Sequence, residues 1–373
     1  KDKTGWKAYE VKSSTSVTET YHLDATIQYY TITNSGIDLK DIFIVHINNE
    51  YEKDGPIDVK QLFHFESVKN EVLEILPSIS NKVAELKKVL LQKEIPQVDI
   101  GPHCSSPYGC DFAGHCWKHI PDYSIFNISR LNGDKKFELY NNGIINFIDV
   151  PDDAPLNDNQ WMQVNSELNN ETIIDKANIK QFVNELNYPL YFMDFETFAT
   201  AVPIFDKSRP YQQLVFQYSL HVLPSEKGKL IHKEYLAETN GIDPRIKFIE
   251  QLIFDCGNKG DILVYNIGFE RGKLNELAEV FPQYSLAIEK ITERMKDLML
   301  PFQKRWYYTP QMKGSYSIKK VLPALVPELS YNNLNISEGG TASNTFAAMV
   351  SGNFEGNTEQ TRKDLLAYCK LDT

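Results

Sequence analysis

Alternation of apolar and polar positions predicts three strands in succession, over residues 189–195, 211–223 and 229–237. A helix is predicted near 243–256, and a further strand over 261–265 precedes more helices. Three strands followed by alternating helices and strands are typical of an α/β sheet that has antiparallel pairs on one side. The sequence therefore predicts an α/β domain in this part of the chain.

The N-terminal part shows a second pattern of the same kind. A strand is predicted over 6–13, after an opening turn, and a helix over 21–33. An apolar strand follows over 41–48, and a helix over 80–94 ends before a Gly-Pro pair. Residues 121–187 carry weaker patterns and predict a small helical connector.

Two carboxylates, Asp194 and Glu196, stand in the apolar run 189–198. Residues two apart in a strand share a face, so both acids point the same way, although the strand is apolar on both faces as buried strands are. Ionised carboxylates at the end of a buried strand are costly unless a positive group neutralises them, and a divalent cation is the usual partner. The alternative is a strand end that emerges into solvent.

Two further acids occupy helices. Glu270 follows the strand 261–265 at the start of a helix, and Asp372 lies in the terminal helix one turn after Tyr368. Residues four apart on a helix share a face, which also carries Cys369. Either acid alone would be a solvated helix residue more often than a metal ligand.

Together, Asp194-Phe-Glu196, Asn-x-x-Phe-Glu270 and Tyr368-x-x-x-Asp372 resemble the three motifs of the DnaQ-like 3′-to-5′ exonucleases, in the subgroup whose third motif carries tyrosine. The resemblance implies a ribonuclease H-like fold in which Tyr368 orients the attacking water. It also implies four carboxylates that hold two Mg or Mn ions: Asp194, Glu196, Glu270 and Asp372. Glu270 stands where the family usually has Asp.

Glu10 and Lys12 share one face of the first predicted strand. This pair suits phosphodiester hydrolysis, with Glu10 as a metal ligand and Lys12 steadying the water or the phosphate. An exposed cross-strand ion pair is the alternative. The helix that follows carries Asp24 and Gln28 one turn apart.

The series Tyr-Glu-Val-Lys-Ser-Ser, followed by a helix with Gln28-Tyr-Tyr, resembles the RecB-like branch of the PD-(D/E)XK nucleases. The resemblance implies a restriction-endonuclease-like α/β domain with Glu10, Lys12 and Gln28 in its site. The metal-binding Asp of that family lies on the preceding strand, which would come before Lys1, and Asp2 in the opening turn is a poor substitute.

Three of the five cysteines crowd into one loop rich in Gly and Pro: Cys104, Cys110 and Cys116. Their spacing fits thiolate ligation of iron and sulfide or of zinc, rather than a disulfide framework. His103 or His115 could complete a zinc site, and reduced structural thiols are the alternative. Iron–sulfur members of the RecB-like nucleases look similar, which implies an iron–sulfur cluster whose fourth cysteine lies upstream of Lys1.

Composition sets further bounds. The 373 residues are 42% hydrophobic and 12% aromatic, which supports substantial cores. No apolar run approaches the roughly 18 residues that span a bilayer, and no secretory signal is present, which predicts no membrane partner and a cytoplasmic location. The net charge of −11 argues against coating nucleic acid by bulk electrostatics, but it is compatible with acids that hold cations against a phosphate.

Two basic features have alternative interpretations. Gly133-Asp-Lys-Lys and Asn142-Gly143-Ile144 faintly resemble a helix-hairpin-helix unit that holds a phosphate backbone. Lys319 and Lys320, on a helix predicted from about Ser315, either face substrate phosphates or form a solvated basic turn.

The sequence as a whole resembles an uncharacterised bacterial family that combines these parts. It predicts a partial RecB-like region with a cysteine cluster over 1–120, the connector over 121–187, and a DnaQ-like domain over 188–373 that is truncated at its C-terminus. The predicted function is two-metal 3′-to-5′ exonuclease action on single-stranded DNA or RNA, or on strands with a free 3′ end. The alternatives are a nucleic-acid-binding or scaffold module with degenerate nuclease sites, and a sugar or nucleotide phosphohydrolase.

Overall fold

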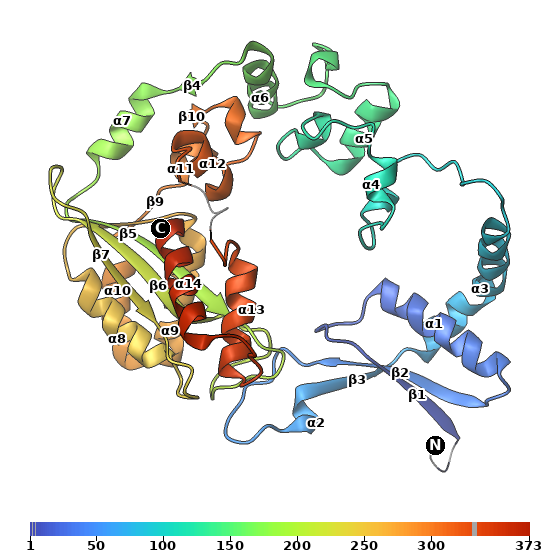
Figure 1. Ribbon diagram of the computed structural model, residues 1–373. Helices are drawn as coiled ribbons and strands as arrows, with labels where there is room; N and C mark the ends of the chain where they lie inside the picture. The colour runs from blue at the N-terminus through green and yellow to red at the C-terminus, as the bar shows by residue number, and fades with distance from the viewer. Residues whose placement is uncertain (2, 4, 330–333) are drawn as a thin grey trace. The chain divides into compact units, whose positions relative to one another are not determined.

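The structure, a computed structural model, describes residues 1, 3, 5–329 and 334–373. It is a mixed α/β protein that divides into two compact units (Figure 1). Unit 1 comprises Lys1–Cys116 and Thr200–Gln212, and unit 2 comprises Trp117–Ala199 and Gln213–Thr373. The sequence divides the chain differently, into residues 1–120, 121–187 and 188–373, and that three-part division stays a prediction. Asp2, in the predicted opening turn, lies outside the described residues.

Unit 1 contains a three-stranded sheet in the order β1-β2-β3. β1 (Trp6–Val11) is parallel to β2 (Leu39–Ile47), and β3 (Phe63–Ser67) is antiparallel to β2. The parallel pair requires a crossover, which α1 (Glu19–Asn34) supplies, as the helical pattern over 21–33 predicts. The core between helices and sheet is apolar and includes Ala25, Ile42, Ile44 and Val72.

Two sequence predictions need correction. α3 (Lys69–Leu90) begins well before the predicted residue 80 and continues through Pro77, because its buried Val72 and Ile79 pack and hold the helix across the proline. The predicted strand 211–223 begins only at Leu214. Residues up to Gln212 belong to unit 1, where the Tyr211 hydroxyl donates to the Ser13 carbonyl.

The remaining helix of unit 1's sheet region is α2 (Val59–Leu62).

Unit 2 is built on a five-stranded sheet in the order β7-β6-β5-β8-β9. β5 (Leu190–Phe198) is central, and β6 (Leu214–Leu223) and β7 (Ile231–Leu236) continue from it as antiparallel neighbours. On its other side, β8 (Asp261–Val264) and β9 (Met295–Asp297) run parallel. The predicted α/β sheet with antiparallel pairs on one side is confirmed.

Helices cover both faces of this sheet (Figure 1). α8 (Arg245–Cys256), α9 (Ile267–Val280) and α10 (Ser285–Thr292) pack on the face that carries Tyr191, Met193 and Phe195. α13 (Gly339–Val350) and α14 (Thr358–Asp372) contact β5 and β6 from the other face. Because strand residues alternate between faces, Asp194 and Glu196 point toward α13 and α14.

The connector is helical, as predicted, and packs around its own apolar core. It contains α5 (Gly133–Asn141), α6 (Asp158–Asn169) and α7 (Lys176–Asn184). β4 (Ile173–Ile174) pairs with β10 (Tyr307–Tyr308) and joins the connector to the segment after the main sheet. The other helices are α4 (Ala113–Cys116), α11 (Leu300–Gln303) and α12 (Ile318–Leu325), with 3-10 turns at Pro102–Cys104, Ile125–Asn127, Phe147–Asp149, Pro282–Tyr284 and Pro310–Met312.

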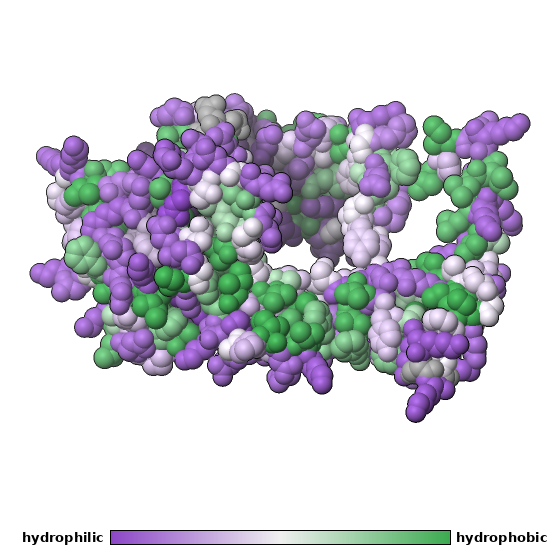
Figure 2. Space-filling model, turned by 60° about the horizontal axis from the view of Figure 1, so that its bottom comes forward, coloured by the Kyte–Doolittle hydropathy of each residue, from purple (hydrophilic) through white to green (hydrophobic). Residues whose placement is uncertain are grey.

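In the part of the chain that the structure describes, no helix combines the length and the apolar character that crossing a bilayer requires. Hydrophilic residues dominate the face shown in Figure 2, with hydrophobic residues in patches among them.

Candidate metal centre

The first two acids come from the end of the central strand. Asp194 pairs with Ser219 and Glu196 with Gln217 across β5 and β6, and a bulge follows between Glu196 and Thr197. Such bulges re-aim side chains at the ends of strands. Glu196 is only 7% exposed, whereas Asp194 is partly exposed, so the sequence prediction of buried carboxylates on this strand is confirmed for Glu196 alone.

α14 brings three polar side chains to the same place. The Tyr368 hydroxyl donates to Asp372 Oδ2 at 3.0 Å, and Cys369 Sγ lies 3.9 Å from Asp194 Oδ2. Helical spacing places Tyr368, Cys369 and Asp372 on one face of α14. Because Tyr368 and Cys369 are buried, this is the face that packs on the sheet.

A thiol lies closer to the strand acids than the sequence indicated. One ligand atom each from Asp194, Glu196 and Cys369 lies within 4.8 Å of the others, a grouping of the size that a metal ion needs. The sequence placed Cys369 on the right helix face, but a buried free cysteine more often serves as a small apolar residue. Only the packing of α14 on β5 shows that its sulfur approaches Asp194.

Glu270 on α9 and Asp372 on α14 lie outside this 4.8 Å grouping, but the charges of both act on Asp194. Glu270 is 2% exposed, and its Oε2 atom has no hydrogen-bond partner among the described residues. Burial, and then the charge of Asp297, raises the pKa of Glu270 to about 8. A buried carboxylate oxygen without a donor is costly, and a cation would satisfy it. The donor set therefore fits a hard divalent ion.

The carboxylates also act on one another. Burial, followed by the charges of Asp372, Glu196 and Glu270, raises the pKa of Asp194 well above its usual value. Burial and Asp372 raise the pKa of Glu196 to about 8, and Lys319 partly offsets this. Groups with such pKa values cluster at functional sites, because like charges in a dry site are stable only when something neutralises them.

Two further elements line this site. A Cβ atom on Gly339, the first residue of α13, would lie 3.5 Å from the Tyr368 hydroxyl and 3.8 Å from Glu196 Oε2. Lys319 Nζ lies over the Tyr368 ring, 6.0 Å from its centroid. Lys319 thus faces the acids, whereas its exposed neighbour Lys320 shows no such contact among the described residues.

A histidine pair lies on the same sheet face beneath α14. The rings of His221 and His232 are 4.6 Å apart, His232 Nε2 is 3.2 Å from Ser219 Oγ, and His221 Nε2 is 3.2 Å from the Lys370 carbonyl. Burial, with smaller effects of His221 and Lys370, lowers the pKa of His232 to about 4, although Glu234 lies 3.8 Å away.

This pair predicts a pH-dependent stability. The folded state favours neutral His232. Its contribution to the free energy of unfolding is therefore complete above the unfolded pKa near 6.5 and is lost as pH falls toward 4. We expect about 1–2 kcal/mol from this group, since solvent screens the partly exposed ring. Urea unfolding at pH 7.5 and at pH 5.0 measures the prediction. Between these pH values, His232→Gln should lose less unfolding free energy than wild type and the control His119→Gln. Equal losses in all three proteins would contradict the assignment.

In unit 1, the structure brings together the residues that the sequence selected. Lys12 Nζ lies 3.0 Å from Glu10 Oε1 and 2.5 Å from Asp24 Oδ2, and Gln28 Nε2 donates to Asp24 Oδ1 at 3.4 Å. Asp24, and then Glu10, raises the pKa of Lys12. Asp24 was visible on the predicted helix face, but its direct contact with Lys12 depends on how α1 packs on β1. The catalytic roles of this group stay predictions.

The cysteine loop is less assembled. The Cys110 amide donates to the Cys104 carbonyl, and Cys116 ends α4. All three thiols are free and partly buried. Across residues 5–329 and 334–373, the thiols of this loop form no group of three ligand atoms within 4.8 Å, with or without His103 and His115. The iron–sulfur cluster and the zinc alternative both stay predictions.

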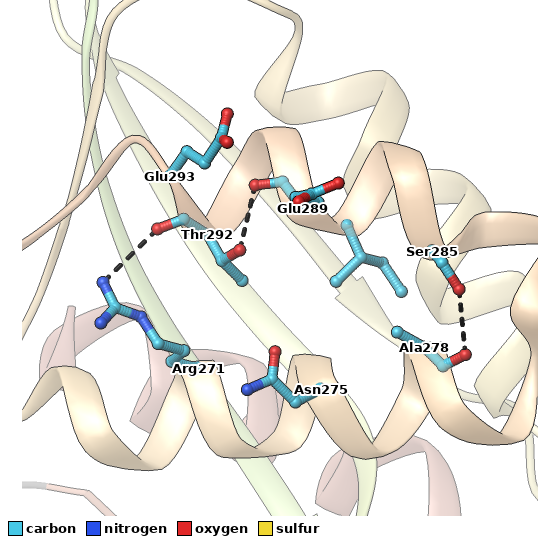
Figure 3. A pocket seen from close by; sticks show the side chains of 8 residues that line it. Arg271, Asn275, Ala278, Ser285, Glu289, Thr292 and Glu293 are labelled. Atoms are coloured by element: carbon cyan, nitrogen blue, oxygen red, sulfur yellow. Dashed lines mark hydrogen bonds between the residues drawn. The ribbon is translucent and has the colours of Figure 1, made fainter.

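A pocket of about 580 Å³ between α9 and α10 is a different feature. Figure 3 shows Arg271 donating to the Thr292 carbonyl and Ser285 donating to the Ala278 carbonyl across it. Its lining mixes charges of both signs and includes no residue of the metal centre. It therefore contributes no ligand to the acid cluster.

Comparisons with known proteins give similarity without a function. Residues 191–317 match a family described as a domain of unknown function, DUF2779. An uncharacterised MG366 homolog of Mycoplasma pneumoniae is 30% identical over 198 residues, which are 48% of this chain and 30% of that protein. Uncharacterised protein UU173 of Ureaplasma parvum is 31% identical over 192 residues, 46% of this chain and 27% of that protein. The chain spans about three tenths of the length of these relatives.

Proposed function

We propose that this protein is a metal-dependent nuclease whose unit 2 removes nucleotides from the 3′ end of single-stranded DNA or RNA. The observation that carries this proposal is the convergence of acids from three elements: Asp194 and Glu196 on β5, Glu270 on α9, and Asp372 on α14. A mixed sheet with helices on both faces supports the ribonuclease H-like assignment. The small sheet of unit 1, with its Glu10 and Lys12 pair, supports the restriction-endonuclease-like assignment in the same way.

Asp194, Glu196, Glu270 and Asp372 are the residues that would hold Mg or Mn. When bound, these ions polarise a phosphodiester and lower the pKa of water, and two of them stabilise both the attacking and the leaving oxygen. Asp194 and Glu196 on β5 group with Cys369 on α14, and the charges of Asp372 and Glu270 act on Asp194. One oxygen of Glu270 has no hydrogen-bond partner among the described residues. Cys369 adds a softer ligand atom beside Asp194, which would widen the range of metals that the site accepts.

Tyr368 is the residue that would orient water. Burial and the neighbouring acids, Asp372 first, raise the pKa of its phenol, so the hydroxyl keeps its proton at neutral pH. It therefore acts as a hydrogen-bond donor and positioning group rather than as a base. Its bond to Asp372 fixes the direction of the hydroxyl toward the acids.

Tyr368→Phe is expected to slow Mg- or Mn-dependent nucleotide release about a hundredfold, the usual effect of removing one preorganised donor, with manganese binding nearly unchanged. Release from end-labelled single-stranded DNA and RNA, with each metal and with EDTA, measures it. Tyr284→Phe, which removes a hydroxyl that donates to Glu250 away from the metal centre, is the matched control.

Three results would decide between the possible functions. Full activity in Tyr368→Phe would exclude its role in catalysis. Manganese binding without cleavage of either strand type would favour the binding or scaffold module. Hydrolysis of mononucleotides but not of oligonucleotides would favour the phosphohydrolase.

A further inference from the structure

Unit 2 contains a second concave site, which we call the basic pocket, with a volume of about 590 Å³. Its walls come from residues 126–130 with Lys136, from the end of β8 with Met299, and from the loop 313–318. Arg130, Lys136 and Lys313 line it, and none of the described residues in its lining carries a carboxylate. In a chain of net charge −11, such a lining is a local reversal of charge.

Buried hydrogen bonds hold the backbone of both walls of the basic pocket in place. Gln163, only 1% exposed, accepts from the Ser129 amide at 2.9 Å and donates to the Asn127 carbonyl at 3.0 Å. On the opposite wall, the Gly314 amide donates to the Tyr308 hydroxyl, and its carbonyl accepts from Arg305 Nη2 at 2.7 Å. The pocket is thus largely preformed, as ligand sites usually are.

The lining contains both cations and aromatic rings. The Arg130 guanidinium lies 5.3 Å from the centroid of the Tyr316 ring and donates to its hydroxyl. The Tyr265 hydroxyl donates to the Tyr316 carbonyl at 2.6 Å, which fixes that residue from the other side. Guanidinium groups recognise phosphate oxygens through paired N–H groups, and tyrosine rings stack on bases of any sequence.

A buried charge lies close to Arg130. Arg305 is 6% exposed, its Nη1 atom has no hydrogen-bond partner within the described segments, and the charge of Arg130 contributes to lowering its pKa, after burial. Glu167 is the carboxylate near Lys313, and burial raises its own pKa. The positive charge around the pocket is therefore only partly offset, which favours an anionic ligand.

The basic pocket and the metal centre are built in part from the same chain segments. Asp297 Oδ1 accepts from the amides of Asn266 and Met299, both of which line the pocket, at 3.1 and 2.9 Å. Ile318 lines the pocket, and the next residue, Lys319, has its Nζ 6.0 Å from the centroid of the Tyr368 ring in the metal centre. One turn of α9 separates Asn266, which lines the pocket, from Glu270.

We propose that the basic pocket binds a nucleotide of a single-stranded nucleic acid whose end lies at the metal centre. Arg130 and Lys313 contact its phosphates, and the base stacks on Tyr316. This inference rests on the proposed function, because it supplies that reaction with its substrate contact. The net negative charge of the protein repels phosphates, whereas the positive charge of this pocket attracts them locally.

Fluorescence anisotropy in EDTA tests binding without cleavage. The probes are fluorescein-labelled single-stranded DNA and RNA 12-mers, and the protein is the full-length chain. Arg130→Gln/Lys313→Gln should weaken binding about tenfold or more and reduce the slope of log Kd against log salt by about two, one for each lost phosphate contact. The charge-matched control Lys118→Gln/Lys180→Gln, which changes exposed residues outside the basic pocket, should change Kd less than twofold.

Equal weakening in the two double variants, or no binding of either 12-mer by wild type, would overturn the basic pocket as a nucleic-acid site. Metal-dependent cleavage with wild-type affinity in Arg130→Gln/Lys313→Gln would refute the basic pocket and leave the proposed function standing. Binding through the basic pocket without cleavage in Mg or Mn would refute the proposed function and leave the basic pocket standing.

Discussion

Asp194→Asn is expected to reduce Mg- or Mn-dependent nucleotide release about a thousandfold or more, equivalent to roughly 4 kcal/mol of transition-state stabilisation. Asp194 is the acid on which the others converge, since Glu196, Glu270 and Asp372 all act on its pKa. An amide keeps the shape of the side chain but is a poor ligand for a hard cation. End-labelled oligonucleotides and both metals provide the assay.

The same substitution should not destabilise the metal-free protein. It removes one acid from a buried cluster in which burial and like charges disfavour ionisation, so we expect an unfolding temperature equal to or above that of wild type. Manganese should raise the unfolding temperature of wild type and raise that of Asp194→Asn much less, because ligand binding stabilises only the state that binds.

Asp152→Asn is the control for both measurements, since it makes the same chemical change in an exposed turn of unit 2. It should keep wild-type activity and the full response to manganese. Wild-type activity in Asp194→Asn would show that the acids on β5 do not carry the chemistry, whatever its unfolding temperature.

Gly314→Ala is expected to cost about 3 kcal/mol of unfolding free energy, the second large effect. The backbone at Gly314 has φ of +75°, where a side chain adds about 1 kcal/mol of strain. A Cβ atom there would lie 2.4 Å from Gln163 Nε2. Gln163 is buried and holds the wall at Asn127 and Ser129, so relieving the clash costs hydrogen bonds as well as packing.

Urea unfolding of the full chain measures this loss, and binding of the single-stranded 12-mers should weaken in parallel. Gly133→Ala is the matched control, because a Cβ atom at this first residue of α5 would meet no atom within 4 Å and φ is not positive. Its stability should be unchanged or slightly increased. A similar stability in both variants would mean that Gln163 yields without cost.

Much of the fold could be predicted from the sequence, because the patterns that predict strands and helices are local. Strand alternation placed Asp194 and Glu196 on one face, and helical spacing placed Tyr368, Cys369 and Asp372 on another. Both predictions concern residues at most four apart, whose relative direction the backbone alone decides. The start of α3 was missed for the opposite reason, since tertiary packing holds that helix through Pro77.

What the sequence by itself determined about this protein is therefore the mixed α/β pattern and the direction of each acid on its own element. Only the tertiary structure decided that Cys369 approaches Asp194, that Asp24 binds Lys12, and that Glu270 keeps a buried oxygen without a partner among the described residues. The basic pocket belongs to the same group, because its walls come from segments far apart in the chain. Such contacts depend on strand order and on how helices pack, and no periodicity within one element encodes them.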